Sequence, residues 1–199
     1  IQLAEAMGVK RASDAQDPGF SNYETRQLTL APSNTYAGVD EIAPITMAAS
    51  YAGFAGKGIV CSPIPIDKIT DRNGENVNFT KNECNQAIDP SVAAGVAYAL
   101  EYNVKNGIGG HARSYHGVPH FAKTGTTNSY WDHWTVGAST EVSTAIWTGN
   151  VVGKVDTEAS GLPFDGDRVF GLIINAADTI YGGQAFEKPS ESAFKVKTK

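Results

Sequence analysis

The stretch Phe121-Ala122-Lys123-Thr124-Gly125-Thr126-Thr127 places a cation, three hydroxyl groups and a glycine together at the end of a predicted strand. Because side chains alternate along a strand, Thr124 and Thr126 should share one face, with Lys123 and Gly125 on the other. Glycine lets another group approach the backbone closely. Such a strand can offer N–H groups and hydroxyls to a carboxylate, with a lysine nearby. The plain alternative is a polar strand end with no binding role.

A similar string carries different chemistry in ion-pumping ATPases, where the sequence Asp-Lys-Thr-Gly-Thr holds a phosphorylated aspartate. Here Ala122 occupies the aspartate position, so no acyl phosphate can form at this place. The interpretation as an ion pump therefore fails on one residue.

Composition and charge narrow the class of protein further. The chain has 199 residues, of which 41% are hydrophobic and 19% charged, and this composition is typical of a globular chain. Its length fits one domain or a piece of a larger one. The net charge is −5, and basic residues gather only in the tail that ends at Lys199, so nucleic-acid binding is disfavoured.

Local signals predict four helices. The first spans about residues 1–7 and ends at Gly8; the second begins near Pro44, and the region from Gly56 ends it. A third should run from Pro90 to Asn106, with Asp89 as the N-cap, and a fourth from Val169 to Tyr181, capped by Asp167. Hydrophobic spacing in the third helix predicts a buried stripe of Val92, Val96, Ala99 and Leu100.

Strand signals dominate the last third of the chain. Residues 121–124, 134–137 and 144–147 predict three successive strands, the last two joined by a short hairpin at 139–142. Upstream, Ile64, Ile66 and Ile69 alternate as in a strand before an Asp71-Arg72-Asn73-Gly74 turn. Helices that surround an antiparallel sheet define an α+β fold. The segment 107–117 holds four glycines and no apolar periodicity, so we expect a mobile loop there.

The only cysteines are Cys61 and Cys84. They could be free thiols in a cytosolic core or one disulfide in an exported protein. Each flanks a segment rich in turn and strand signals, which favours a disulfide across a surface hairpin. It would close a loop of about 24 residues, worth roughly 3 kcal/mol in the chain-entropy model.

Four histidines lie within 23 residues, at His111, His116, His120 and His133. Their spacing lacks the i, i+4 pattern that would place two ligands on one helix face, so we expect no metal site. The three tryptophans, Trp131, Trp134 and Trp147, are expected in the core or a cleft wall.

Several sequence blocks together resemble one known family. Lys-Thr-Gly is one of three signatures of penicillin-binding proteins and class A β-lactamases. The string 121–127, followed by 132–137 and 146–149, closely resembles the transpeptidase domain of class A penicillin-binding proteins. The segments 38–48, 55–58 and 63–74 fit the same family. The resemblance covers the chain to about Pro189, and in this context the cysteine pair resembles actinobacterial members.

The chain departs from the family pattern in two places. No Ser-x-Asn motif occurs, and the one Ser-x-x-Lys, Ser192-Ala193-Phe194-Lys195, follows Lys123 instead of preceding it. We therefore expect residues 1–189 to be the carboxy-terminal part of a transpeptidase domain, with a polar tail at 190–199. The amino-terminal half, which carries the nucleophilic serine, should be a separate polypeptide or an absent segment.

The resemblance implies a role for each residue of the motif. Thr124 and Thr126 would bind the carboxylate of a D-Ala-D-Ala stem peptide or of a β-lactam. Lys123 would supply positive potential and assist proton transfer, and the N–H of Thr126 would be one oxyanion donor. Gly125 would leave room for substrate, and Thr127 and Tyr130 are weaker candidates at the cleft rim.

The function implied by the resemblance is D,D-transpeptidation, by serine acyl transfer that cross-links peptidoglycan stem peptides, with no cofactor. The parent protein is expected in the cell envelope, outside the cytoplasm, with an amino-terminal membrane anchor and a glycosyltransferase activity. Two alternatives stay open: a serine β-lactamase or D,D-carboxypeptidase on the same fold, and an inactive binding or scaffold module. On any of these interpretations, this chain alone should lack acylation activity.

Overall fold

A computed structural model describes residues 1–12, 28–29, 40–79, 83–107, 110–150, 153–159 and 166–191. Helices surround the larger of two antiparallel sheets, so the expected α+β class is confirmed. In chain order the elements are α1 (Gln2–Ala6), α3 (Pro44–Ala55), β1 (Ile59–Cys61), β2 (Cys84–Gln86), α4 (Pro90–Asn106), the 3-10 turn η2 (Gly110–Ala112), β3 (Phe121–Thr126), the 3-10 turn η3 (Asn128–Tyr130), β4 (Asp132–Ala138), β5 (Ser143–Gly149) and α5 (Gly166–Tyr181).

The central sheet has the order β3-β4-β5, and both pairs of neighbours are antiparallel. The backbone N–H of Ser139 donates to the carbonyl of Val142 at 2.9 Å, which closes the predicted hairpin. The register places Thr126 opposite His133, and His133 opposite Thr148. Side chains in such a row stand on the same face of the sheet, so these three residues face the same way.

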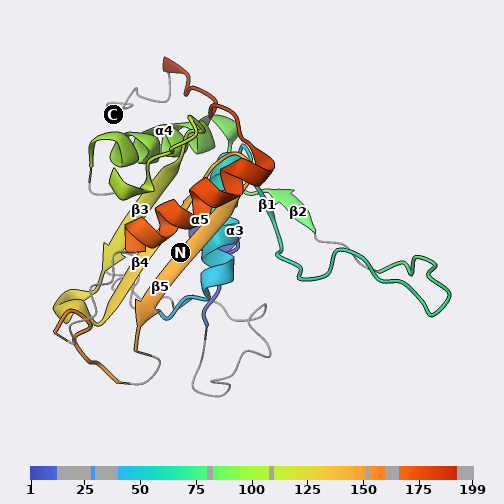
Figure 1. Ribbon diagram of the computed structural model, residues 1–199, viewed down its shortest axis with the longest axis horizontal. Coiled ribbons are helices and arrows are strands. Elements are labelled where there is room, and N and C mark those ends of the chain that lie inside the picture. The colour runs from blue at the N-terminus through green and yellow to red at the C-terminus, as the bar shows by residue number, and fades with distance from the viewer. Residues whose placement is uncertain are drawn as a thin grey trace.

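Helices cover both faces of the central sheet (Figure 1). On one face, Phe170 and Ile174 of α5 are fully buried and pack on Ala122 of β3. On the other face, Phe121 packs against Tyr51 and Phe54 of α3 and Ala97 of α4. The tilted ring of Phe186, 4.9 Å from that of Phe121, extends this second core. None of the described helices is long and apolar enough to cross a membrane.

The helix α4 begins and ends as predicted, and its cap is present. The carboxylate of Asp89 accepts hydrogen bonds from the hydroxyl and the backbone N–H of Ser91, and both lower its pKa. The predicted stripe is only partly correct: Leu100 packs on the core, but Val92 is 51% exposed, and the buried residues are Ala93, Ala97 and Val104. The small alanines let α4 approach the aromatic core closely. The spacing of the larger hydrophobic residues did not predict this buried face.

The residues after β1 form an arm that extends away from the body (Figure 1). The predicted turn is present, with Gly74 at φ +84° and a hydrogen bond from the Val77 N–H to the Ile69 carbonyl. Ile64 and Ile66 are not in a strand, and both are exposed, because none of the described strands pairs with this part of the arm. Cys61 and Cys84 form the expected disulfide between β1 and β2, at the base of the arm.

The segment ahead of β3 differs from the expectation. From Gly110 it forms a 3-10 turn that packs on α5, and Ala112 is fully buried. Gly171 of α5 makes this possible, because a Cβ there would collide with the carbonyl oxygen of His111. Asp167 lies inside the first turn of α5, not at its cap, and is 3.3 Å from the ring of His111. The expectation of few packing contacts is therefore wrong for the turn Gly110–Ala112, whereas Tyr115, His116 and Gly117 are exposed.

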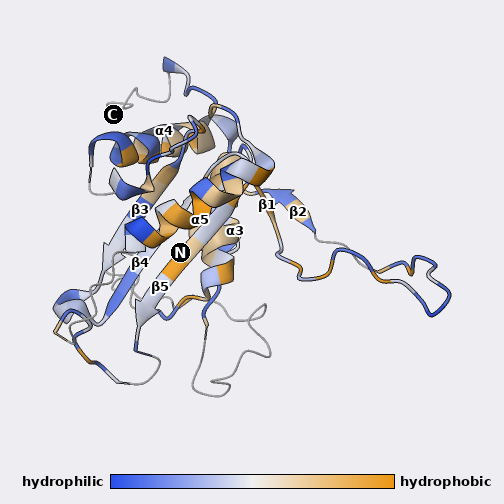
Figure 2. Ribbon diagram, viewed as in Figure 1, coloured by the Kyte–Doolittle hydropathy of each residue, from blue (hydrophilic) through white to orange (hydrophobic). Residues whose placement is uncertain are grey.

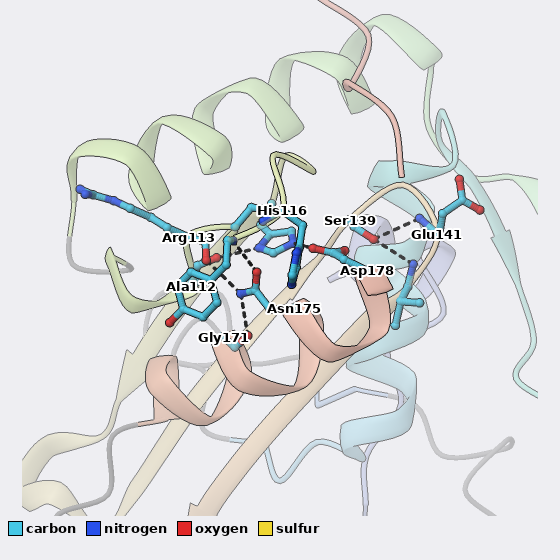
Figure 3. A network of polar contacts seen from close by, with 12 residues as sticks. Ala112, Arg113, His116, Ser139, Glu141, Gly171, Asn175 and Asp178 are labelled. Atoms are coloured by element: carbon cyan, nitrogen blue, oxygen red, sulfur yellow. Dashed lines mark hydrogen bonds and ion pairs between the residues drawn. The ribbon is translucent and has the colours of Figure 1, made fainter. Parts of the chain in front are cut away.

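Polar side chains of α5 tie this segment down (Figure 3). His120 contacts the Ala112 carbonyl through Nδ1 and the Asp178 carboxylate through Nε2, each at 2.8 Å. The amide of Asn175 donates to the Arg113 carbonyl at 3.0 Å and accepts from the Tyr115 N–H at 2.6 Å. The side chains of His120 and Asp178 are 0% and 1% exposed. Because carbonyls accept only, Nδ1 of His120 carries a hydrogen.

We expect the disulfide in the protein as isolated from its own compartment. Its intact mass without reductant should be lighter by two hydrogen atoms than its mass after reduction. Replacement of both residues (Cys61→Ser with Cys84→Ser) should lower the free energy of unfolding by about 3 kcal/mol, because the unfolded chain gains entropy. Two free thiols in the isolated protein would contradict the assignment.

Asp178→Ala should lower the free energy of unfolding by about 3–5 kcal/mol, because it leaves the buried ring of His120 without its partner. Urea denaturation of the assembled protein measures this loss. Thr179→Ala is the matched control, since its exposed hydroxyl donates to the Ala176 carbonyl of the same helix. Equal losses in the two variants would show that the buried contact contributes nothing.

Candidate functional site

The motif strand β3 pairs with β4 along one edge, and no other described strand pairs along its second edge. The backbone N–H of Thr127 donates to the Asp132 carbonyl at 3.0 Å, so Thr127 points its backbone groups toward β4. In an antiparallel pair, successive residues turn their N–H and C=O groups alternately toward and away from the partner. Those of Ala122, Thr124 and Thr126 therefore point away from β4, to the open edge.

Side chains already occupy the inner part of this edge. Asn103 of α4 donates from Nδ2 to the Ala122 carbonyl at 2.9 Å. Lys123 donates from Nζ to the Thr124 carbonyl at 2.6 Å. Beyond them, the N–H of Thr126 points away from β4, and Thr126 itself is exposed. The edge thus opens to solvent at the Lys-Thr-Gly-Thr motif.

The register brings the predicted hydroxyls together. Thr124 and Thr126 stand on one face of the sheet, and Lys123 and Gly125 on the other, as strand alternation predicts. The contact of Lys123 with the Thr124 carbonyl nevertheless carries its ammonium group to the edge between the two faces. The outer end of the strand therefore offers a cation, two hydroxyls and a backbone N–H within a few residues.

Sequence reasoning weighed His133 only as a metal ligand and missed its place beside the motif. Its Nδ1 is 3.3 Å from the hydroxyl oxygen of Thr126, and its Nε2 is 2.9 Å from that of Thr157. The ring of Tyr130 stacks on it, with centroids 6.3 Å apart. The register between residues 121–127 and 132–138, counted back from the turn, was the signal that could have found it.

Thr127 and Tyr130, the two weaker candidates, shape the turn between β3 and β4. The Thr127 hydroxyl accepts from the Asp132 N–H at 2.9 Å, and Tyr130 follows Ser129 with both residues at positive φ, 55° and 62°. That hydroxyl already has a partner within the turn, so a contact between Thr127 and substrate stays a prediction.

The histidines do not converge in the described residues. His111 lies beside Asp167, His120 is buried beside Asp178, and His133 lies at the motif. No three or more His, Cys, Asp or Glu side chains of the described chain gather as metal ligands would. A hollow of about 290 Å³ lies near Phe54, Thr140 and Phe186, at the hairpin end of the sheet, and is separate from the motif end of β3.

Comparison with known proteins identifies the family. A model of the penicillin-binding protein transpeptidase domain matches residues 4–157. The chain belongs to this family, whose members are peptidoglycan transpeptidases. It is 30% identical to penicillin-binding protein 1A of Aquifex aeolicus over 159 residues, which are 78% of this chain and 21% of that protein. It is 31% identical to penicillin-binding protein 1A of Mycobacterium tuberculosis over 166 residues, or 74% of this chain and 19% of that protein.

Solved structures show the same relation. The penicillin-binding protein PonA1 of Mycobacterium tuberculosis superimposes with a TM-score of 0.70 at 26% identity, over 96% of this chain and 52% of that one. The structure of PonA1 in complex with penicillin V matches with the same TM-score at 25% identity. The chain thus spans about a fifth of the length of these curated relatives and about half of the PonA1 structure.

Gly125 offers a test that separates site from fold. A Cβ there would meet only the Cβ of Trp134, at an ordinary 3.7 Å, whereas one at Gly137 would collide with the Phe121 carbonyl and the Phe170 ring. Gly125→Ala should therefore keep the melting temperature within about 2 °C and slow acylation by a β-lactam about tenfold or more, through loss of space at the edge.

The matched variant Gly137→Ala should instead lower the melting temperature by several degrees, because two packed elements must move. Thermal denaturation and stopped-flow acylation of the assembled protein measure both effects. A Gly125→Ala protein that acylates at the parent rate would show that nothing approaches the strand at that residue.

Proposed function

We propose that this chain provides the substrate-binding strand of a D,D-transpeptidase, which cross-links peptidoglycan stem peptides through a serine ester. The observation that carries the proposal is the open edge of β3. There the outward N–H of Thr126 and the hydroxyls of Thr124 and Thr126 stand beside the Lys123 ammonium. Such a set of donors suits a ligand that combines a carboxylate with a reactive carbonyl group.

Each donor has a separate task in the acyl transfer. The hydroxyls of Thr124 and Thr126 bind the terminal carboxylate of a D-Ala-D-Ala peptide or the carboxylate of a β-lactam. The ammonium of Lys123 provides positive potential beside them and assists proton transfer. The N–H of Thr126 stabilises the oxyanion that forms on the attacked carbonyl, where one such donor contributes about 3 kcal/mol. Gly125, on the face that it shares with Lys123, leaves the approach to the strand open from that side.

The nucleophile belongs to the amino-terminal half of the same domain, with its Ser-x-x-Lys and Ser-x-Asn motifs. In support, this chain contains no Ser-x-Asn, and its one Ser-x-x-Lys match, at Ser192, follows Lys123 in the chain instead of preceding it. The helix α5 is also hydrophobic on its outer side (Figure 2), where Leu172 and Ile180 are 58% and 73% exposed. The missing half is the occupant that we propose for part of this surface.

We place the assembled protein in the cell envelope, outside the cytoplasm, with an amino-terminal membrane anchor and a glycosyltransferase domain. The disulfide between Cys61 and Cys84 supports an oxidising compartment. The relatives named penicillin-binding protein 1A, of which this chain covers about a fifth, leave ample length for further domains.

The experiment that tests the proposal is stopped-flow acylation of the assembled protein by a penicillin. Thr126→Val keeps the shape of the side chain but removes its hydroxyl, so acylation should slow by about ten- to a hundredfold, the loss of one hydrogen bond to a charged group. This chain alone should form no acyl adduct, because it lacks the nucleophile.

Thr148→Val is the matched control. Thr148 stands in the same row of the sheet, two strands from Thr126, and its buried hydroxyl has no hydrogen-bond partner in the described structure. The control should therefore acylate at the parent rate. An unchanged rate for Thr126→Val would overturn the assignment of this strand, and rapid hydrolysis of the adduct would indicate a β-lactamase instead.

A further inference from the structure

A chain of hydrogen bonds runs from the motif into the neighbouring loop. The hydroxyl of Thr157 lies 2.6 Å from the Tyr130 carbonyl and 2.9 Å from Nε2 of His133. Nδ1 of the same ring lies 3.3 Å from the hydroxyl of Thr126. Thr126 and His133 are paired residues whose backbone groups point away from each other, the arrangement that brings cross-strand side chains closest.

The positions of the hydrogens follow from the chemistry of each group. The Tyr130 carbonyl can only accept, so the single hydroxyl hydrogen of Thr157 is donated to it. The oxygen of Thr157 then accepts from His133, which requires a hydrogen on Nε2. In a neutral imidazole the other nitrogen is an acceptor, so Nδ1 takes the hydrogen of the Thr126 hydroxyl. With His133 neutral, Thr126 turns only lone pairs toward a ligand.

Protonation of His133 reverses this polarity. Both ring nitrogens of an imidazolium are donors, so Nδ1 then donates to the oxygen of Thr126. The hydroxyl hydrogen of Thr126 becomes available to a carboxylate, which accepts hydrogen bonds only. The positive ring also lies one side chain away from that carboxylate. Both effects favour carboxylate binding.

From this geometry we propose that His133 is a positioning residue that sets the donor direction of the Thr126 hydroxyl, so that binding of a carboxylate ligand is coupled to proton uptake at His133. The inference rests on the proposed function, because it assigns Thr126 to the ligand carboxylate. It adds a residue of β4, and the loop that holds it, to the set that determines specificity for a free carboxylate.

Among the described residues, the groups that hold the ring in place are uncharged. Tyr130 stacks on it at an interplanar angle of 18°, and the Thr157 N–H donates to the Tyr130 carbonyl at 3.0 Å, which ties the loop to the turn. The charged groups on the described neighbouring elements contact other partners or face solvent. Lys123 contacts the Thr124 carbonyl, and Asp132 contacts the indole of Trp147. Asp156 accepts from the N–H groups of residues 158 and 159, Lys154 lies over the Trp131 ring, and Glu158 is exposed.

The test measures acylation of the assembled protein by benzylpenicillin and by its methyl ester between about pH 5 and 8. His133→Phe keeps an aromatic ring against Tyr130 but removes both nitrogens. The ratio of the parent rate to the His133→Phe rate should rise about tenfold as the pH falls with benzylpenicillin, and by a smaller factor with the ester, which accepts hydrogen bonds but carries no charge. The ratio cancels the titration of groups common to both proteins.

His133→Asn provides the rescue. Its amide can donate to Thr126 at every pH, so this variant should acylate at near the parent's low-pH rate throughout. Independently of any variant's folding, nitrogen NMR of the parent at high pH should show His133 with its hydrogen on Nε2. A hydrogen on Nδ1, or a pH-independent rate ratio in a protein that acylates normally, would overturn the inference alone. Absence of acylation in the parent at every pH would overturn the proposed function, and the inference with it.

Discussion

The buried contact between His120 and Asp178 ties the residue immediately before β3 to the helix α5. Both side chains are almost completely excluded from solvent, so neither can exchange its partner for water. Asn175, one turn earlier on α5, holds the backbone of Arg113 and Tyr115 in the same way. Together these side chains bind the segment before β3 to the helix that covers the sheet, and the position of the motif strand follows from them.

A strand fixed at its inner end can leave its outer end without a neighbour. Along the open edge of β3, Asn103 satisfies the Ala122 carbonyl and Lys123 satisfies that of Thr124. An unpaired edge usually invites association with another strand. Here the inner backbone groups are covered by side chains, and the outward N–H of Thr126 stands where a ligand can approach. The contacts that hold the segment before β3 on α5 therefore also leave the outer end of β3, with the N–H of Thr126, accessible for acyl transfer.

Signals local in the sequence predicted the elements well, and those that depend on packing did not. Pro44, Asp89 and Pro90 fix helix starts through their own backbone chemistry, so α3 and α4 begin where expected. The buried face of α4 depends on how closely alanines can approach an aromatic core, and Val92 was misplaced for that reason. His133 was missed because its partner Thr126 lies on another strand, and only the register of the hairpin brings them together.

The most direct measurement is a crystal structure of the assembled protein after reaction with a penicillin. We expect the ligand carboxylate within hydrogen-bond distance of the hydroxyls of Thr124 and Thr126, and the ester carbonyl oxygen beside the N–H of Thr126. A ligand held away from β3, or a β3 edge covered by another strand of the assembled domain, would contradict the assignment of this edge as the substrate-binding site.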